Sequence, residues 1–371
     1  MSGCAQGWRS RMHIQQATQD YEQWLARHIR VLKDDLKVKH ERMAEDPFRF
    51  RRATFYRWMQ LFPSLCPELM ETPTVLAVGD LHVENYGTWR DTEGRLVWGI
   101  NDFDEAFPLP YAVDLVRLAA SARLVIQLKR LPFENADACA AILDGYAVGL
   151  RDGGEPFVLS ERHRGMLAAV TGRERDPTEF WEKLSSLPTA SSVPAAVNAR
   201  LKAALPGQGL KFRVAHRLAG LGSLGRERYT AITDWCGGKI ARETKPLLPS
   251  ACSWAGARAG RGKFFYAAIL RQSVRAADPF LTVRDGWVLR RLSPFCSRIE
   301  LHQLTRGHDR TKLVHAMGRE LANIHLGTPE AVAAIRRDLR QRDPDWLRAA
   351  AETMVSATLN DWREWRRGEK G

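Results

Sequence analysis

The sequence predicts a mixed α+β fold in which helical segments accompany a small antiparallel sheet. Apolar residues recur at helical spacing over residues 15–44 and again over residues 312–325. From Phe212 onwards, three short runs of β-forming residues alternate with glycine-rich turns. Turns this short join strands that run in opposite directions, so we expect the sheet to be antiparallel.

The expected elements follow the chain in order. Residues 15–44 form one helix in this interpretation, and the basic segment after it packs its aromatic side chains, Phe48, Phe55 and Trp58, into a core. Strands at residues 75–78, 86–89 and 95–100 come next, the last two as a hairpin around Asp91-Thr92-Glu93-Gly94. Further helices are expected at residues 114–128, 136–150, 177–184, 193–204, 262–274, 312–325 and in the C-terminal segment, and further strands at residues 212–218, 226–233, 239–245 and 287–292.

Composition narrows the class of protein. The chain has 371 residues, of which 44% are hydrophobic and 27% charged, which suits a globular protein large enough for two domains or two lobes. The formal net charge of +13 favours anionic ligands, although a basic solvated surface explains it equally well. No run of five like charges marks a nucleic-acid tail, and we do not expect a nucleic-acid partner.

The cysteines and the apolar segments indicate the cellular compartment in which we expect the protein. The six cysteines form no CxxC pair and no zinc spacing, which is typical of free thiols in a reducing compartment. The N-terminus carries no apolar signal segment. The longest apolar region, residues 115–128, is interrupted by Arg117 and Arg123 and is too short to span a bilayer. We therefore expect a cytoplasmic protein, and the sequence does not indicate its oligomeric state.

The acidic residues that follow the first strand carry most of the chemistry. Asp80 comes directly after that strand, where a carboxylate can position a substrate hydroxyl and accept its proton. Asn85 offers an amide oxygen to a hard cation, and the hairpin returns the chain so that Asp102 lies beside it. Asp104 and Glu105 add negative charge for a second ion, although acidic residues are also common in turns. These residues together predict a magnesium site beside a general base.

The segment GDLHVENYG, followed by GINDFDEAFPLPYAVDLVRLAAS, resembles the catalytic segment of aminoglycoside phosphotransferases and choline kinases. It resembles more closely a bacterial family called domain of unknown function 2252, whose pattern includes GDxHxxNFG and NDFDE. The resemblance extends over residues 47–325. It implies that Asp80 is the catalytic-loop aspartate, Asn85 and Asp102 are magnesium ligands, and Asp114 braces the loop from a helix start. The histidine that precedes this loop in many phosphotransferases is Val78 here.

A glycine-rich loop appears later, at residues 220–225, with the pattern GxGxxG. A dinucleotide fold would need a helix next, but residues 226–232 alternate in the manner of a strand, and no GK[ST] follows. We therefore expect a hairpin that covers phosphates with Gly220, Gly222, Ser223 and Gly225. His82 is expected to form a hydrogen bond within its own loop, more readily than to bind a metal.

A cation on the strand after this loop should hold the phosphates. Arg242 and Lys245 are both candidates and lie on opposite strand faces. We favour Arg242, because it precedes Glu243 as lysine precedes glutamate in many members of the resembled family. Lys245 shares a face with Glu243 and could pair with it. The helix glutamate of kinases has no counterpart before Glu300, so Glu243 or Asp278 replaces it, or the pair is absent.

The order of these parts is rotated relative to kinases. Residues 287–292 resemble the strand before an inter-lobe hinge, and residues 317–325 resemble the helix after it, with His325 as a buried structural histidine. The resemblance implies a circularly permuted, protein-kinase-like bilobal fold. The expected parts are an N-terminal helical segment (1–46), a helical catalytic lobe (47–210), a nucleotide-binding β lobe (211–292), and a hinge with C-terminal helices (293–371).

The function expected from these motifs is ATP- and Mg²⁺-dependent phosphoryl transfer to an unknown small-molecule or protein acceptor. The missing helix glutamate leaves open a pseudokinase that binds nucleotide without turnover. A metallophosphoesterase is a third reading, since Asp80-x-His82 also begins such a site. It is disfavoured because that chemistry needs more metal ligands, and no Asn-His dipeptide occurs in the chain.

Overall fold

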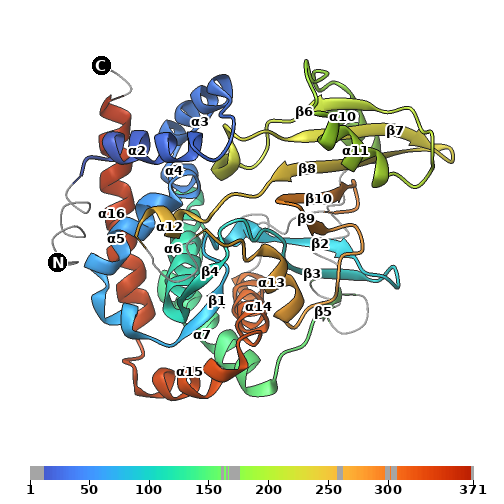
Figure 1. Ribbon diagram of the computed structural model, residues 1–371. Helices are drawn as coiled ribbons and strands as arrows, with labels where there is room; N and C mark the ends of the chain where they lie inside the picture. The colour runs from blue at the N-terminus through green and yellow to red at the C-terminus, as the bar shows by residue number, and fades with distance from the viewer. Residues whose placement is uncertain are drawn as a thin grey trace.

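The computed structural model describes residues 12–159, 163, 166, 176–256, 262–296, 301 and 307–368. They form the expected α+β fold, with a mainly helical part and several small antiparallel sheets (Figure 1). The first eleven residues of the predicted N-terminal segment, and part of the segment after β10 where a hinge was predicted, lie outside the described residues.

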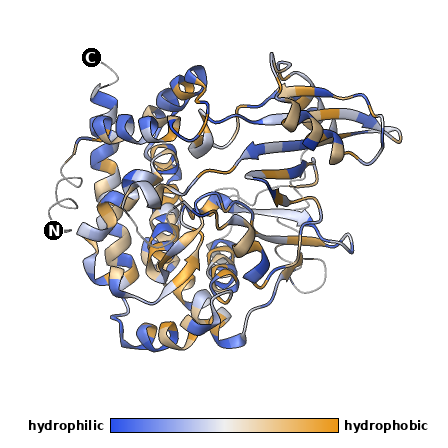
Figure 2. Cartoon of the chain, in the orientation of Figure 1, coloured by the Kyte–Doolittle hydropathy of each residue, from blue (hydrophilic) through white to orange (hydrophobic). Residues whose placement is uncertain are grey.

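Most of the helices pack together in one large hydrophobic core, and most carry both hydrophobic and hydrophilic residues (Figure 2). Helices α7 and α14 approach closely because each has glycine at the contact. A Cβ atom on Gly145 would lie 2.0 Å from the carbonyl oxygen of His315. The helices of this part are α2 (Ile14–Ala26), α3 (Lys33–Glu45), α4 (Pro47–Ala53), α5 (Phe55–Leu65), α6 (Tyr111–Lys129), α7 (Asn135–Asp152), α12 (Ala251–Trp254), α13 (Tyr266–Gln272), α14 (Gly307–His325), α15 (Pro329–Gln341) and α16 (Trp346–Gly368).

The single helix expected over residues 15–44 is two helices, so this prediction is wrong. Helix α2 ends at Ala26 and α3 begins at Lys33. Between them, the backbone N–H of Leu32 donates a hydrogen bond to the carbonyl of Gly225, at 2.9 Å. The break therefore follows from a contact with the distant glycine-rich loop, which local helical periodicity does not encode. The aromatic side chains of the next segment are buried, as predicted.

The predicted hairpin is confirmed and is the element that positions the acidic residues. Strands β2 (Tyr86–Arg90) and β3 (Leu96–Ile100) pair antiparallel with Tyr86 opposite Ile100. Beyond this pair, the N–H of Asn101 donates to the carbonyl of Asn85 at 3.0 Å. The short strand β5 (Phe157–Val158) adds to β3, while β1 (Thr74–Ala77) pairs with β4 (Phe107–Pro110). Strands β4 and β5 were not predicted.

The glycine-rich region forms a five-stranded antiparallel sheet in the order β6-β7-β8-β10-β9. Its strands are β6 (Arg213–His216), β7 (Tyr229–Trp235), β8 (Gly238–Pro246), β9 (Thr282–Arg284) and β10 (Trp287–Leu292). Helices α10 (Pro177–Ser185) and α11 (Ala195–Ala203) pack against this sheet, through Leu184 and Leu201 among others. Both helices precede residue 210, where we expect the boundary of the catalytic helical lobe.

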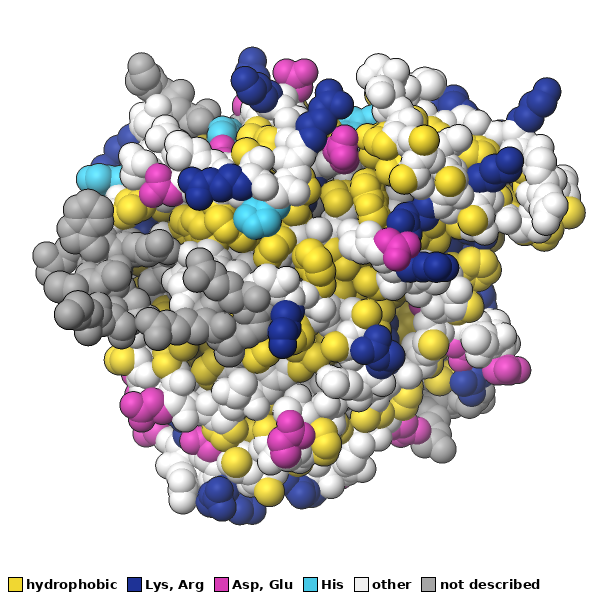
Figure 3. All heavy atoms as spheres, viewed as in Figure 1, with side chains coloured by type: hydrophobic (Ala, Val, Ile, Leu, Met, Phe, Trp, Pro, Cys, Tyr) yellow, Lys and Arg dark blue, Asp and Glu magenta, His cyan; other side chains and the backbone are white. Residues whose placement is uncertain are grey.

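The described helices include none that is long and apolar enough to cross a membrane. On the face drawn in Figure 3, basic side chains are scattered among acidic and apolar ones.

Candidate functional site

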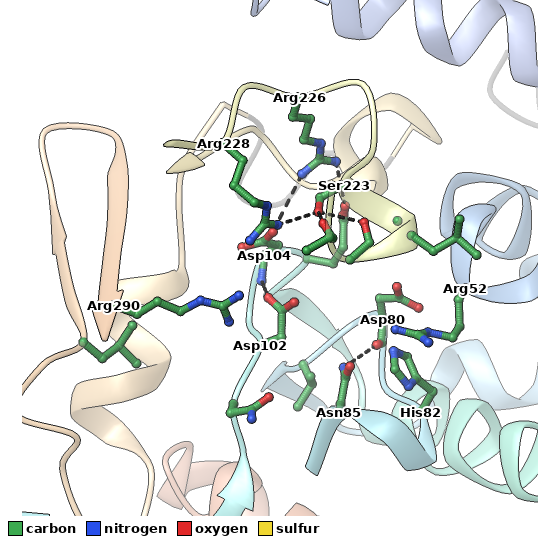
Figure 4. Close-up of a pocket in the computed structure, with 18 of the residues that line it drawn as sticks. Arg52, Asp80, His82, Asn85, Asp102, Asp104, Ser223, Arg226, Arg228 and Arg290 are labelled. Carbon is green, nitrogen blue, oxygen red and sulfur yellow. Dashed lines mark hydrogen bonds and ion pairs between the residues drawn. The ribbon is translucent and has the colours of Figure 1, made fainter. Parts of the chain in front are cut away.

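A cavity of about 340 Å³ lies between the acidic loops of the helical part and the five-stranded sheet. It brings together residues from several segments that lie far apart in the sequence (Figure 4). The predicted site residues that line it are Asp80, His82, Asn85, Asp102, Asp104, Gly220, Gly222 and Ser223. The acidic residues and the glycine-rich loop therefore face one cavity, although about 115 to 140 positions separate them in the sequence.

Asp114 fixes the start of the Asp80 loop. This fully buried residue lies in the first turn of α6 and accepts hydrogen bonds from the backbone N–H groups of Val78, at 2.7 Å, and Gly79, at 2.9 Å. Its Oδ2 also lies 3.1 Å from Nε2 of His325, which is buried. Gly79 has a φ of +83°, and a side chain there would meet the carbonyl oxygen of Glu105. This arrangement holds Asp80 at the cavity wall.

Arg117 holds one side of Asp80. Its Nε donates to Asp80 Oδ1 at 2.9 Å, and its Nη2 contacts the same oxygen. The arginine is fully buried, and its guanidinium lies 4.8 Å from the ring centroids of both Phe55 and Trp58. We did not predict this role. The available signal was a charge in the middle of an apolar helix, one turn after Asp114.

Asn85 and Asp102 lie side by side at the ends of the hairpin strands. The Asn85 Nδ2 donates to the Asp80 carbonyl at 2.7 Å, so its amide oxygen is the atom that could bind a cation (Figure 4). Burial opposes ionisation of Asp102, but Lys245, Arg290 and Arg228 nearby hold its pKa below the ordinary value. Asp102 therefore remains a carboxylate over the whole physiological range.

Lys245 reaches the acidic residues from strand β8. Its Nζ lies 2.6 Å from Oδ2 of Asp104 and 3.3 Å from Oδ1 of Asp102. The other oxygen of Asp104, Oδ1, is buried and has no hydrogen-bond partner among the described residues. A buried carboxylate oxygen without a donor is suited to a cation.

The donor set fits Mg²⁺ better than a transition metal. One amide oxygen and two carboxylates, from Asn85, Asp102 and Asp104, are the hard oxygen ligands that Mg²⁺ takes alongside phosphate and water. Across the described part of the chain, no group of three or more His, Cys, Asp or Glu side chains is placed to hold a metal. The metallophosphoesterase reading has no further ligands to support it there.

Arg242 contacts neither Asp102 nor Asp104, so the contacts favour Lys245 over our preferred Arg242. Its Nε donates to the carbonyl of Ala204 at 3.2 Å, and its guanidinium lies 4.7 Å from the ring centroid of Phe280. The two cations do lie on opposite faces as predicted. The sheet face covered by α11 takes Arg242, so Lys245 is the one that reaches the acidic residues.

The glycine-rich loop lies directly over Asp80. A Cβ atom on Gly222 would lie 2.9 Å from the carbonyl oxygen of Arg52 and 3.7 Å from Asp80 Oδ2. Gly220 and Gly225 have φ angles of +73° and +91°, which favour glycine. Ser223 Oγ donates to the carbonyl of Gly220 at 3.0 Å. The loop is therefore folded back tightly, and only a residue without a side chain fits at position 222.

Glu243 does not pair with Lys245, contrary to what we considered. Its carboxylate, which is 1% exposed, instead accepts hydrogen bonds from Arg217, Arg228 and Arg290, at 2.6 to 2.9 Å. Burial opposes its ionisation, but the three arginines hold its pKa well below the ordinary value. Asp278 also lines the cavity, where its Oδ1 accepts from the N–H of Phe280.

His82 and Glu105 serve local structure. The Nδ1 atom of His82 accepts from the backbone N–H of Glu84 at 3.1 Å, within its own loop as expected. Glu105 accepts from Ser250 Oγ at 2.9 Å and from the N–H of Ala251 at 2.7 Å, at the start of α12. Burial is the main cause that raises the pKa of Glu105 to about 7.

Comparison with known proteins shows a similarity to one bacterial family. Residues 30–175 match the model of a family described as an uncharacterized protein conserved in bacteria (DUF2252). The match includes Asp80, Asn85 and Asp102 and ends before the glycine-rich loop. It covers less than half of the chain. It confirms the predicted resemblance to this family over those residues. No curated protein and no solved structure matches the chain, and the resemblance to phosphotransferases has no support from these comparisons.

Proposed function

We propose that the protein is an ATP- and Mg²⁺-dependent phosphotransferase with a circularly permuted, kinase-like arrangement. The observation that carries the proposal is the shared cavity, in which Gly222 lies over Asp80. Asp102 also lines this cavity and is contacted by Lys245 of strand β8. A phosphoryl-transfer site needs a phosphate-covering loop, a cation, metal ligands and a base around one small volume. Each of these parts is present here in a residue of suitable chemistry.

The roles follow from the atoms that each residue has free. Arg117 occupies Oδ1 of Asp80, so Oδ2 is the oxygen that would orient an acceptor hydroxyl. In the proposed reaction the hydroxyl oxygen bonds to the γ-phosphorus while the bond to the β–γ bridging oxygen breaks. ADP leaves, and the hydroxyl proton passes to Asp80.

Asn85, Asp102 and Asp104 would hold Mg²⁺, which when bound neutralises charge on the β- and γ-phosphates. Lys245 now contacts both carboxylates, and its ammonium would be shared with an incoming phosphate oxygen. The nucleotide lies, in this proposal, between the acidic loops and the sheet that carries Lys245.

The kinase-like permutation is supported by the positions of the parts in space. The five-stranded sheet follows the acidic loops in the sequence, yet it packs over them with its glycine-rich loop inward. Helix α14 follows the sheet and returns to the acidic loop, where His325 contacts Asp114. A rotated chain order is physically tolerable because the same contacts form in either order.

A second candidate, a nucleotide-binding protein without turnover, is favoured by one observation. Every carboxylate expected to act already has a cation beside it, with Arg117 on Asp80 and Lys245 on Asp102 and Asp104. Such a protein would bind ATP but not transfer its phosphate, because Asp80, paired with Arg117, would not act as a base for the acceptor hydroxyl.

The test is nucleotide turnover with ATP and Mg²⁺ across a panel of hydroxyl acceptors. Asp80→Asn and Asp102→Ala should lower turnover by at least about 100-fold, the usual contribution of a general base. Asp234→Asn is the matched control, since Asp234 is 78% exposed on the sheet hairpin. Equal turnover in the wild type and both site variants would reject catalysis. Binding of ATP without turnover by the wild type would select the second candidate.

A further inference from the structure

Three arginines from different segments converge on the carboxylate of Glu243. Arg217 follows β6, Arg228 precedes β7, and Arg290 lies on β10. Arg217 Nη1 donates to Oε2 at 2.7 Å and Arg228 Nη1 donates to Oε1 at 2.6 Å. Arg290 uses both Nε, at 2.9 Å, and Nη2, at 2.7 Å. All three arginines line the same cavity as Asp80, and together they are called the arginine triad.

The triad carries more positive charge than its partner neutralises. One buried carboxylate balances one guanidinium, which leaves an excess of about two positive charges on this cavity wall. The side chains of Arg217 and Arg290 remain 25% and 30% exposed, while Glu243 is buried. Each guanidinium has five N–H donors, and Glu243 uses only one or two of them. Donors therefore remain that can face an anion in the cavity.

The triad is connected to the parts assigned to phosphoryl transfer. Arg228 Nη2 donates to Ser223 Oγ at 2.8 Å, which links it to the glycine-rich loop. Figure 4 shows Arg290 pointing toward Asp102, and both residues line the cavity. An anion between the loop and Asp102 would thus lie against the triad.

We propose that the arginine triad binds the phosphates of the nucleotide and that Glu243 is a positioning residue that sets the orientation of the three guanidiniums. The inference rests on the proposed function, because it assigns the ligand of that site. The planar fork of arginine matches two phosphate oxygens at once, which a lysine cannot do. The triad then adds phosphate contacts to the one proposed for Lys245.

The experiment is calorimetric binding of inorganic triphosphate, ATP and adenosine to the full chain. Arg217→Ala and Arg290→Ala are the test variants, because each leaves Glu243 with two arginine partners. Arg284→Ala is the matched control, since Arg284 lies on the same sheet with its side chain 83% exposed. Arg290→Lys keeps the charge without the fork and serves if Arg290→Ala does not fold, as judged by thermal unfolding.

The wild type should bind triphosphate and ATP, and adenosine much more weakly. Each alanine variant should bind triphosphate and ATP about 10- to 100-fold more weakly than the wild type does. Arg290→Lys should bind them about 3- to 10-fold more weakly. Arg284→Ala should stay within about twofold, as expected for an exposed charge.

Three results would overturn the triad: no triphosphate binding by the wild type, adenosine binding as tight as ATP binding, or unchanged affinity in the alanine variants. The outcomes separate this inference from the proposed function. If the variants lose affinity but the wild type does not turn over ATP, phosphate binding by the arginine triad is supported and the phosphotransferase proposal is rejected. Turnover by the wild type with unchanged binding in the variants does the reverse.

Discussion

The ammonium of Lys245 lies 2.6 Å from Oδ2 of Asp104, although the two residues are 141 positions apart in the sequence. Lys245 belongs to the five-stranded sheet and Asp104 to the loop after the β2–β3 hairpin. The pair therefore joins the sheet to the acidic loop and fixes which face of β8 is turned toward the proposed metal ligands.

Lys245→Met should raise the KM for Mg·ATP by about 10- to 100-fold, because it removes a charged donor from the proposed phosphate site. Arg242→Met, on the opposite face of the same strand, loses its contacts with Ala204 and Phe280. It should lower the stability but leave the KM within about threefold, as expected away from the site. Steady-state kinetics on folded protein checks both.

The difference in KM between the two variants tests the position of each side chain, because both substitutions remove one positive charge from β8. A larger rise in KM with Arg242→Met than with Lys245→Met would restore our first preference for Arg242. It would also contradict the proposed orientation of the sheet.

Arg117→Met should destabilise the protein by about 3–5 kcal/mol, the usual cost of removing one partner of a buried ion pair. Arg117 is fully buried against Phe55 and Trp58, and its loss leaves Asp80 without that partner. Arg123→Met on the same helix is the control, since its partner Glu352 is 49% exposed. It should cost less than about 1 kcal/mol. Urea denaturation measures both, and equal costs would show that Arg117 has no special role.

Gly222→Ala should reduce kcat/KM by about 100-fold, because a shift of about 1 Å in a site can cost this much. The added methyl would lie 2.9 Å from the carbonyl oxygen of Arg52, so the loop must move away from Asp80. Gly238→Ala is the control, since nothing lies within 4 Å of a Cβ there. If both variants keep full activity, the glycine-rich loop does not cover the reacting groups.

Stability should fall as the pH rises from about 4.5 to about 7, partly because of Glu320. Burial raises the pKa of this glutamate from 4.5 to about 7, against hydrogen bonds from Asn323 and Ile100. In this window the native state holds a proton that the unfolded state has lost. The protonated carboxyl of Glu320 therefore contributes its full stabilisation below pH 4.5. This contribution to the free energy of unfolding, about 3 kcal/mol at most, is lost as the pH rises toward 7.

Glu320→Gln removes this titration, so its free energy of unfolding should change less between pH 4.5 and pH 7 than that of the wild type. Denaturation at several pH values gives the slope, which is independent of any constant cost of the substitution. Glu105 has a similarly raised pKa and keeps its own contribution in both proteins. Identical slopes would exclude a protonated Glu320 in the native state.

The acidic half of the site was predictable because local structure builds it. The turn at Asp91-Thr92-Glu93-Gly94 sets a hairpin, and a hairpin necessarily returns Asp102 to Asn85. Arg117 is one of two arginines in an apolar helix, and the sequence alone marks it only as an interruption of a hydrophobic run.

The other half depends on long-range packing. Strand alternation separates Arg242 from Lys245, but only the covering helices decide which face is turned to the cavity. The break between α2 and α3 follows from the bond between Leu32 and Gly225, nearly 200 residues away. Of the three arginines that converge on Glu243, Arg217 and Arg228 come from the two ends of the loop between β6 and β7, and Arg290 comes from β10. No local sequence pattern predicts this convergence.

The most direct test of the central claim is a crystal structure with Mg²⁺ and a non-hydrolysable ATP analogue. We expect the metal on Asn85, Asp102 and Asp104, the γ-phosphate beside Oδ2 of Asp80, and the other phosphates against Lys245 and the arginine triad. Nucleotide bound elsewhere on the protein, or in this cavity with its phosphates turned away from Asp102, would contradict it.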